Sequence, residues 1–123
     1  MTDTPALLIV WHSRTGGSEA LARAAAEGAG AAGQLVRADD VTSDLLIAAG
    51  GSLFVGPENL AALSGAMKEI FDRCYYPCLG QLEGRPYATI ICAGSDGENA
   101  QRQLDRIATG WRLRRVAEGV IVN

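Results

Sequence analysis

The chain has 123 residues, of which 48% are hydrophobic, and a formal net charge of −3 at neutral pH. This length fits one domain, residues 1–123, and the apolar content excludes intrinsic disorder and a collagen-like repeat. The charge is mildly negative and the apolar runs are strand-length, so we expect neither nucleic-acid binding nor a membrane span. Met1–Pro5 lacks the pattern of a signal peptide, which leads us to expect a cytoplasmic protein.

The three cysteines, Cys74, Cys78 and Cys92, follow no Cys-x-x-Cys spacing. We therefore expect reduced thiols, with no disulfide framework and no metal site. Cys92 falls inside an apolar run, which is typical of a small core residue.

The first predicted strand is the unbroken apolar run 6–10, a pattern typical of a central parallel strand that is covered on both faces. A turn rich in hydroxyls and glycine follows at 13–18. Apolar residues at helical spacing then predict an amphipathic helix that begins near Gly17 or Ser18 and stops at Gly33.

A short second strand is predicted over 34–37. Thr42 or Ser43 is expected to cap a short helix that runs through Ile47. The run 52–55 predicts the third strand, which leads into a polar loop.

That loop covers 56–59 and is followed by a helix with its apolar face at positions 67–74. We expect this helix to stop near 75–77, where a proline follows two tyrosines. A fourth strand is predicted over 87–93, with a loop at 94–98 after its carboxyl end.

A last helix is predicted from the apolar stripe between Ala100 and Trp111, and a fifth strand over 116–122. Strands that alternate with helices at this spacing indicate right-handed crossovers and a parallel α/β sheet. Ligands of such sheets bind beyond the carboxyl ends of the strands, here between the first and third strands.

The turn 13–18 combines the hydroxyls of Ser13, Thr15 and Ser18 with the free N–H groups at the start of a helix, a combination that favours an anion. No lysine follows its last glycine, which argues against a triphosphate loop, and it contains no cysteine for phosphatase chemistry. The remaining candidate ligand of this turn is a phosphate monoester. The alternative is an ordinary turn in which Ser18 caps the helix.

A Gly-x-Gly-x-x-Gly pattern at 28–33 does not indicate a dinucleotide site. It follows a helix and precedes a strand, which reverses the required order.

Residues 13–18 read Ser-Arg-Thr-Gly-Gly-Ser and resemble the flavin mononucleotide (FMN) phosphate loop of the flavodoxin-like family, Ser/Thr-x-Thr-Gly-x-Ser/Thr. The blocks 56–68 and 93–98 resemble that family's two ring-binding loops, in the same order along the chain. The resemblance implies a three-layer, doubly wound flavodoxin-like fold with a parallel five-stranded sheet of order 2-1-3-4-5. Here the usual last helix is missing from the pattern.

The resemblance also implies an FMN-binding flavoprotein in electron transfer, either an NAD(P)H-dependent oxidoreductase or a flavodoxin-type electron carrier that serves a redox protein. The alternative is a non-catalytic module that binds a phosphate ligand or a protein on the same scaffold. No side chain is expected to be catalytic, because the flavin carries the chemistry. The residues implied to bind FMN are Ser13, Arg14, Thr15, Gly16, Gly17, Ser18, Pro57, Glu58, Asn59, Leu60, Gly94, Ser95, Asp96 and Gly97.

His12, the only histidine, stands beside the turn, and both a phosphate-side role and a structural role are open. Arginines 102 to 115 form either a docking site for an acidic partner or nucleotide, or a solvated face. One face of the sheet is expected to be covered by a single helix, whereas two helices cover it in the family. Apolar surface would then stay open, so we expect a homodimer.

Overall fold

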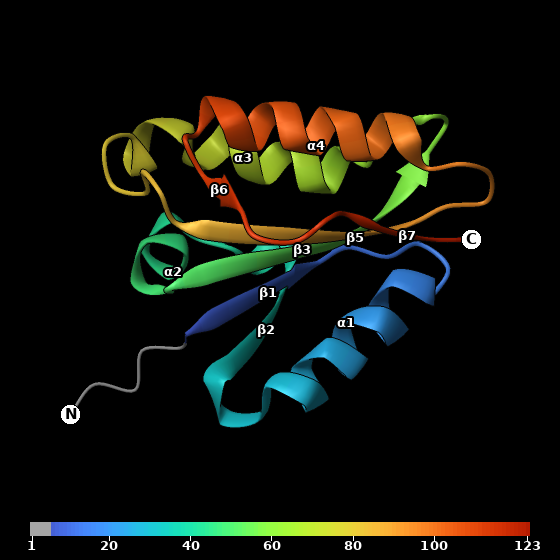
Figure 1. Ribbon diagram of the computed structural model, residues 1–123, viewed down its shortest axis with the longest axis horizontal. Coiled ribbons are helices and arrows are strands. Elements are labelled where there is room, and N and C mark those ends of the chain that lie inside the picture. Colours follow the sequence, from blue (N-terminus) through green and yellow to red (C-terminus); the bar gives the residue numbers. More distant parts are fainter. Residues whose placement is uncertain (1–5) are drawn as a thin grey trace.

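The computed structural model describes residues 6–123, and Met1–Pro5, which carry the signal-peptide expectation, lie outside the described residues. A parallel sheet separates one helix on its first face from three helices on its second (Figure 1). The elements in chain order are β1 (Leu7–Trp11), α1 (Gly17–Ala29), β2 (Gly33–Arg37), α2 (Ser43–Ala48), β3 (Gly51–Asn59), β4 (Ala62–Leu63), α3 (Gly65–Cys78), β5 (Pro86–Cys92), α4 (Glu98–Gly110), β6 (Arg114–Arg115) and β7 (Val120–Val122), with 3-10 turns at Gly30–Ala32 and Ala38–Asp40.

The sheet order is β2-β1-β3-β5-β6 with parallel pairing throughout, and β7 also pairs in parallel with β5. The predicted order 2-1-3-4-5 is therefore confirmed, with β5 as the fourth strand and β6 and β7 together as the fifth. The small strand β4 is an addition, since it pairs antiparallel with the end of β3.

The fifth strand differs from the prediction, because it is not continuous over 116–122. Arg115 pairs with Tyr87 and Val120 pairs with Ile90, so the edge strand advances five residues while β5 advances three. The two extra residues cannot join the ladder, and the chain bulges out between β6 and β7.

The central position of β1 explains its unbroken apolar sequence. Leu8, Ile9 and Val10 are completely buried. Leu8 and Val10 belong to the large core under α2, α3 and α4, whereas Ile9 packs with Ala22 of α1 on the other face. Both faces of this strand are thus covered, as expected for a central parallel strand.

Two helices show how local sequence sets their ends. Thr42 caps α2, because its Oγ1 accepts from the N–H of Leu45 at 3.2 Å. The predicted stop of α3 near 75–77 agrees to within one residue with its end at Cys78, and the helix includes Pro77. Pro77 lies in the last turn, where a missing N–H costs one hydrogen bond and does not break a following turn.

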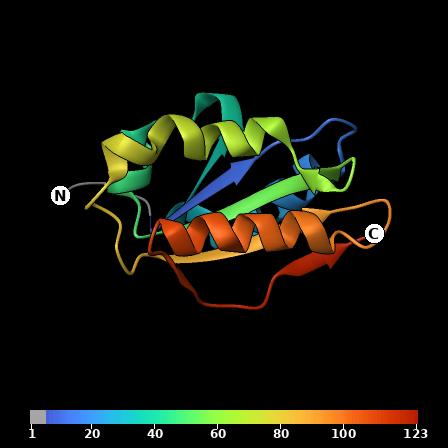
Figure 2. The same ribbon diagram turned by 90° about the horizontal axis from the view of Figure 1, so that it is seen from above.

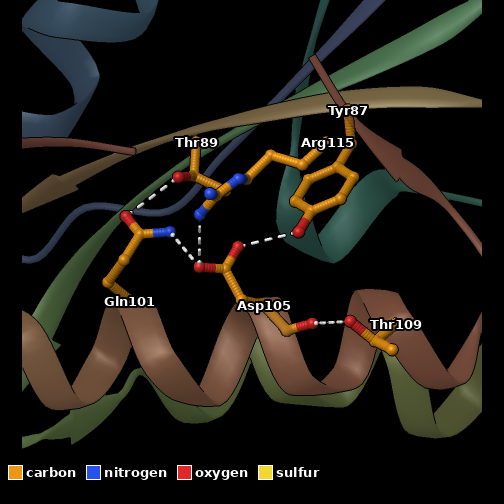
Figure 3. Close-up of polar contacts among 6 residues, drawn as sticks. All are labelled: Tyr87, Thr89, Gln101, Asp105, Thr109 and Arg115. Carbon is orange, nitrogen blue, oxygen red and sulfur yellow. Dashed lines mark hydrogen bonds and ion pairs between the residues drawn. The ribbon is translucent and has the colours of Figure 1, made fainter. Parts of the chain in front are cut away.

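A polar network fastens α4 to β5 (Figure 3). The buried Tyr87 hydroxyl donates to Asp105 Oδ1 at 2.7 Å, and the buried Thr89 hydroxyl donates to Gln101 Oε1 at 2.9 Å. Gln101 Nε2 in turn donates to Asp105 Oδ2 at 3.1 Å, and Arg115 lies 3.4 Å from the same oxygen. Burial, followed by the bond to Asp105, raises the pKa of Tyr87. These bonds fix the position of α4 over the sheet.

The two sheet faces are covered unequally. Seen from the side of α3 and α4, these helices lie side by side over the strands (Figure 2). On the opposite face, α1 is the single α-helix that residues 6–123 provide, and it packs mainly against β1 and β3. Val120 at the β7 edge is 52% exposed as a result. Within the described residues, no helix has the length and apolar character needed to cross a membrane.

Candidate functional site

Three connections meet at the carboxyl ends of β1, β3 and β5, on the same side of the molecule as the C-terminus (Figure 1). They enclose a cavity of about 420 Å³. Its lining residues are Ser13, Arg14, Thr15, Ser18, Pro57, Glu58, Asn59, Cys92, Ala93 and Gly94. All three stretches that the sequence singled out are therefore brought to one place.

The first side of the cavity is the turn 13–18. The Ser13 Oγ accepts from the N–H of Gly16 at 2.9 Å, which closes the turn. Gly16 is the residue before α1 and has φ of 102°, a left-handed conformation that favours glycine. The alternative interpretation of Ser18 as the helix cap is wrong, because Gly16 occupies that position and no side chain of residues 6–123 caps α1.

The Ser18 hydroxyl has a notable environment. Ser18 is 2% exposed, and among residues 6–123 its Oγ has no hydrogen-bond partner. A buried hydroxyl without a partner destabilises a protein by about 1–3 kcal/mol. Because Ser18 also lines the cavity, an acceptor oxygen of a bound phosphate would satisfy it. The residues of this turn thus fit the phosphate of a cofactor.

The second side of the cavity is the end of β3. The predicted loop 56–59 is wrong, since β3 continues to Asn59 and turns back into β4. Glu58 pairs with Leu63 and Asn59 with Ala62 in this hairpin. Leu60 and Ala61 form its tip with φ of 50° and 63°, a conformation that non-glycine residues rarely adopt.

Hydrogen bonds with α4 hold the hairpin in place. Glu58 Oε2 accepts from the N–H of Ala100 at 3.1 Å, and Gln103 Oε1 accepts from the N–H of Leu63 at 2.7 Å. Asn99 Nδ2 also donates to the carbonyl of Ala61. Sequence reasoning missed Asn99 and Gln103. Their contacts with the hairpin join segments about 40 residues apart, and no local sequence pattern indicates them.

The third side is the connection after β5. Gly94 lines the cavity, but the Asp96 carboxylate is turned toward α4, where its Oδ1 accepts from the N–H of Glu98 at 2.9 Å. Gly97 has φ of 71° and is the residue immediately before α4. Ala93, which begins the block 93–98, also lines the cavity, and so does Cys92, which was missed although its place at the end of a strand was a usable signal.

Some predicted site residues lie outside the lining. Gly16 and Gly17 shape the turn through their backbone, and Leu60 is fully exposed at the hairpin tip. Ser95, Asp96 and Gly97 belong to the β5–α4 connection but do not line the cavity either.

His12 connects β1 to the start of α3. Its Nδ1 lies 2.9 Å from Ser64 Oγ, which also accepts from the N–H of Met67 at 3.4 Å. Burial lowers the pKa of His12, Asp39 opposes that shift, and Arg14 and Arg37 add to it. His12 is absent from the cavity lining, so its contacts fit a structural position beside the turn.

Residues 39–123 match the family model described as NADPH-dependent FMN reductase. The chain belongs to this family. FMN is therefore the cofactor of this FMN reductase family member, and the resemblance to the flavodoxin-like family is confirmed. The match begins after the turn 13–18, so the assignment of this turn depends on its sequence and geometry.

Solved structures show the same fold. A flavodoxin from the domain Archaea superposes with a TM-score of 0.84 at 18% identity, over 94% of this chain and 81% of its own. The two-electron reduced flavodoxin of Megasphaera elsdenii gives 0.76 at 22% identity, over 94% and 85%. A WrbA-like flavodoxin from Agrobacterium tumefaciens gives 0.73 at 20% identity, over 87% and 73%. No curated protein matches this family member by sequence.

Proposed function

We propose that the protein is an FMN-dependent oxidoreductase that accepts electrons from NAD(P)H, and that FMN binds in the cavity at the carboxyl ends of β1, β3 and β5. The observation that carries the site is the buried Ser18 hydroxyl in the wall of this cavity, which has no partner among residues 6–123. When bound, FMN supplies the electron-transfer chemistry, and the chain binds and orients it.

The turn 13–18 would hold the phosphate. Ser13, Thr15 and Ser18 offer hydroxyls, Arg14 offers a cation, and the first N–H groups of α1 offer donors at the positive end of a helix. The net contribution of each charge-assisted hydrogen bond is about 1.5–3 kcal/mol, so several together can hold a dianion.

The ring would lie against the second and third sides of the cavity. Pro57, Glu58, Asn59 and Gly94 line this part. The neighbouring residues would form the rim, namely Leu60, Ser95, Asp96 and Gly97. The family's description as NADPH-dependent supports the pyridine nucleotide as electron donor.

A visible absorption spectrum and an NADPH oxidation assay test this proposal. We expect flavin bands after reconstitution with FMN, and NADPH oxidation by the holoprotein with a soluble acceptor. A holoprotein that oxidises NADPH only when a separate reductase is added is a flavodoxin-type carrier. A colourless protein that fails to bind FMN would favour the non-catalytic binding module.

We also propose that two copies associate through the sheet face beside α1. Ile90 and Val122 are half-buried there, and Val120 is 52% exposed. A second copy over this strip would bury apolar strand surface that otherwise contacts water. Sedimentation equilibrium should give twice the mass of one chain. In Val120→Glu, the measured mass should shift toward that of a single chain. A single-chain mass for the unchanged protein at all concentrations contradicts the dimer.

A further inference from the structure

The Cys92 thiol lies in the wall of the proposed cofactor cavity, beside the start of α1. Cys92 is the last residue of β5 and is half-buried. Its Sγ approaches Gly17 so closely that a Cβ on this glycine would lie 2.9 Å from the sulfur. The thiol therefore has no free space on its α1 side, and Cys92 is one of the residues that line the cavity.

A second feature marks the same place as a ligand site. The Ser18 hydroxyl, one residue after Gly17, is 2% exposed, has no partner among residues 6–123, and lines the same cavity. Cys92 thus borders the part of the cavity where the Ser18 hydroxyl can donate to a ligand.

The other two cysteines have a different environment. Cys74 and Cys78 lie in α3, within the core, and are 1% and 3% exposed. Burial raises the pKa of the Cys78 thiol, which further disfavours its reactive thiolate. The fold therefore separates one accessible thiol from two protected ones.

We propose that Cys92 is a modification site for small hydroperoxides, and that its oxidation and FMN binding exclude each other. This inference rests on the proposed cofactor site. The thiol loses its proton to water, and the sulfur then attacks one oxygen of the hydroperoxide. An S–O bond forms, the O–O bond breaks, and the released alkoxide or hydroxide takes up a proton. Sulfur is oxidised by two electrons to a sulfenic acid, and the peroxide is reduced.

The exclusion follows from the space around the sulfur. An oxygen added to Sγ cannot point toward Gly17, where even a methyl group does not fit. It must enter the cavity between the turn 13–18 and the β5–α4 connection, and there it competes with the cofactor. Conversely, bound FMN covers the thiol.

Alkylation with iodoacetamide measures the access of each thiol. Intact mass and peptide mapping of the FMN-free protein should show one fast adduct, at Cys92, with Cys74 and Cys78 as internal controls. With FMN at about 100 times its Kd, labelling of Cys92 should slow by about 100-fold, since about 1% of the chains are then free. Riboflavin at the same concentration should protect less.

Hydrogen peroxide then tests the exclusion itself. Dimedone should trap the sulfenic acid at Cys92, and FMN affinity, measured by fluorescence quenching, should fall at least about tenfold and return after dithiothreitol. In Cys92→Ala, peroxide should leave FMN affinity at its value before treatment. The matched variant Cys78→Ala should keep the peroxide-dependent loss.

The outcomes separate the two proposals. If the untreated protein does not quench FMN, the proposed function is wrong and the exclusion falls with it. If FMN binds but Cys92 is labelled at the same rate with and without it, or oxidised protein binds FMN as before, only the inference about Cys92 is overturned.

Discussion

The N-termini of α1 and α4 both lie at the cavity end of the sheet, and both follow a left-handed glycine that offers no side-chain cap. They differ in what their first N–H groups bind. In α4, the N–H groups of Glu98 and Ala100 donate to the carboxylates of Asp96 and Glu58. In the part of the chain that the structure describes, no side chain accepts from the first turn of α1.

This difference assigns separate tasks to two similar helix ends. The start of α4 already has two negative charges of the protein itself, which complement its dipole and stabilise the fold. The start of α1 keeps its donors for an anion from outside. Substitutions beside α1 should therefore change ligand affinity, whereas substitutions beside α4 should change mainly the free energy of unfolding.

The largest expected effect is on FMN affinity in Ser18→Ala. Loss of one charge-assisted hydrogen bond should weaken FMN binding by about 1.5–3 kcal/mol, a factor of about 10 to 160. The stability of the FMN-free protein should not fall, because the deleted hydroxyl has no partner in the described part of the chain. Fluorescence titration and urea unfolding measure the two quantities.

Riboflavin is the control for this variant. It lacks the phosphate, so it should bind wild type weakly and should lose little further affinity in Ser18→Ala. Equal affinities of wild type for riboflavin and FMN would refute the assignment of the turn 13–18.

Glu58→Ala should have the opposite profile. The variant removes the acceptor of the Ala100 N–H and one charge at the start of α4. Loss of such a cap costs about 0.5–2 kcal/mol of stability. Its effect on FMN affinity should be smaller than that of Ser18→Ala. Glu58→Gln, which keeps an acceptor oxygen, should recover part of the stability, and a larger loss of affinity than of stability would break the contrast.

The hairpin tip offers a smaller, stabilising change. Ala61 has φ of 63°, so Ala61→Gly should relieve strain and raise the free energy of unfolding by about 0.5–1 kcal/mol. Ala62→Gly is the matched control, because this neighbour lies in β4 and glycine should weaken the strand. Urea unfolding of both variants checks the sign, and a destabilised Ala61→Gly would contradict the prediction.

The smallest effect concerns pH and the start of α3. Burial lowers the pKa of His12 below 6.5, its value in the unfolded chain. The unfolded state then binds more protons between the two pKa values, so stability is complete above pH 6.5 and falls as the pH drops toward the folded pKa. Because His12 is the only histidine, His12→Gln should remove this decline. If thermal unfolding shows that the stability of His12→Gln falls with pH as steeply as that of wild type, the attribution of this decline to His12 is contradicted.

Features that depend on neighbouring residues were predictable from the sequence. The unbroken apolar run of β1 predicts its burial. Thr42 predicts the start of α2, and its hydrogen-bond partner, the N–H of Leu45, lies only three residues further along the chain. The start of α1 at Gly17 follows from the same kind of local pattern. Hydrophobic periodicity and turn chemistry act over a few residues, which is why such elements can be located without coordinates.

Features that depend on distant partners were not predictable. The strand character of 56–59 comes from pairing with β4, and the break in the fifth strand comes from its register against β5. The same limit applies to the site. The turn 13–18 carries a recognisable pattern, whereas the close contact between Cys92 and Gly17 joins distant segments and has no local signal.

The separation of the cavity's walls along the chain has a consequence for folding. Its lining comes from residues 13–18, 57–59 and 92–94, so the cavity exists only after β1, β3 and β5 have paired. A chain that has not yet placed β5 cannot bind the cofactor. Free FMN should therefore draw the folding equilibrium toward the native state, by about 2.7 kcal/mol at 100 times Kd. The lifetime of the protein in a cell would then follow its flavin supply.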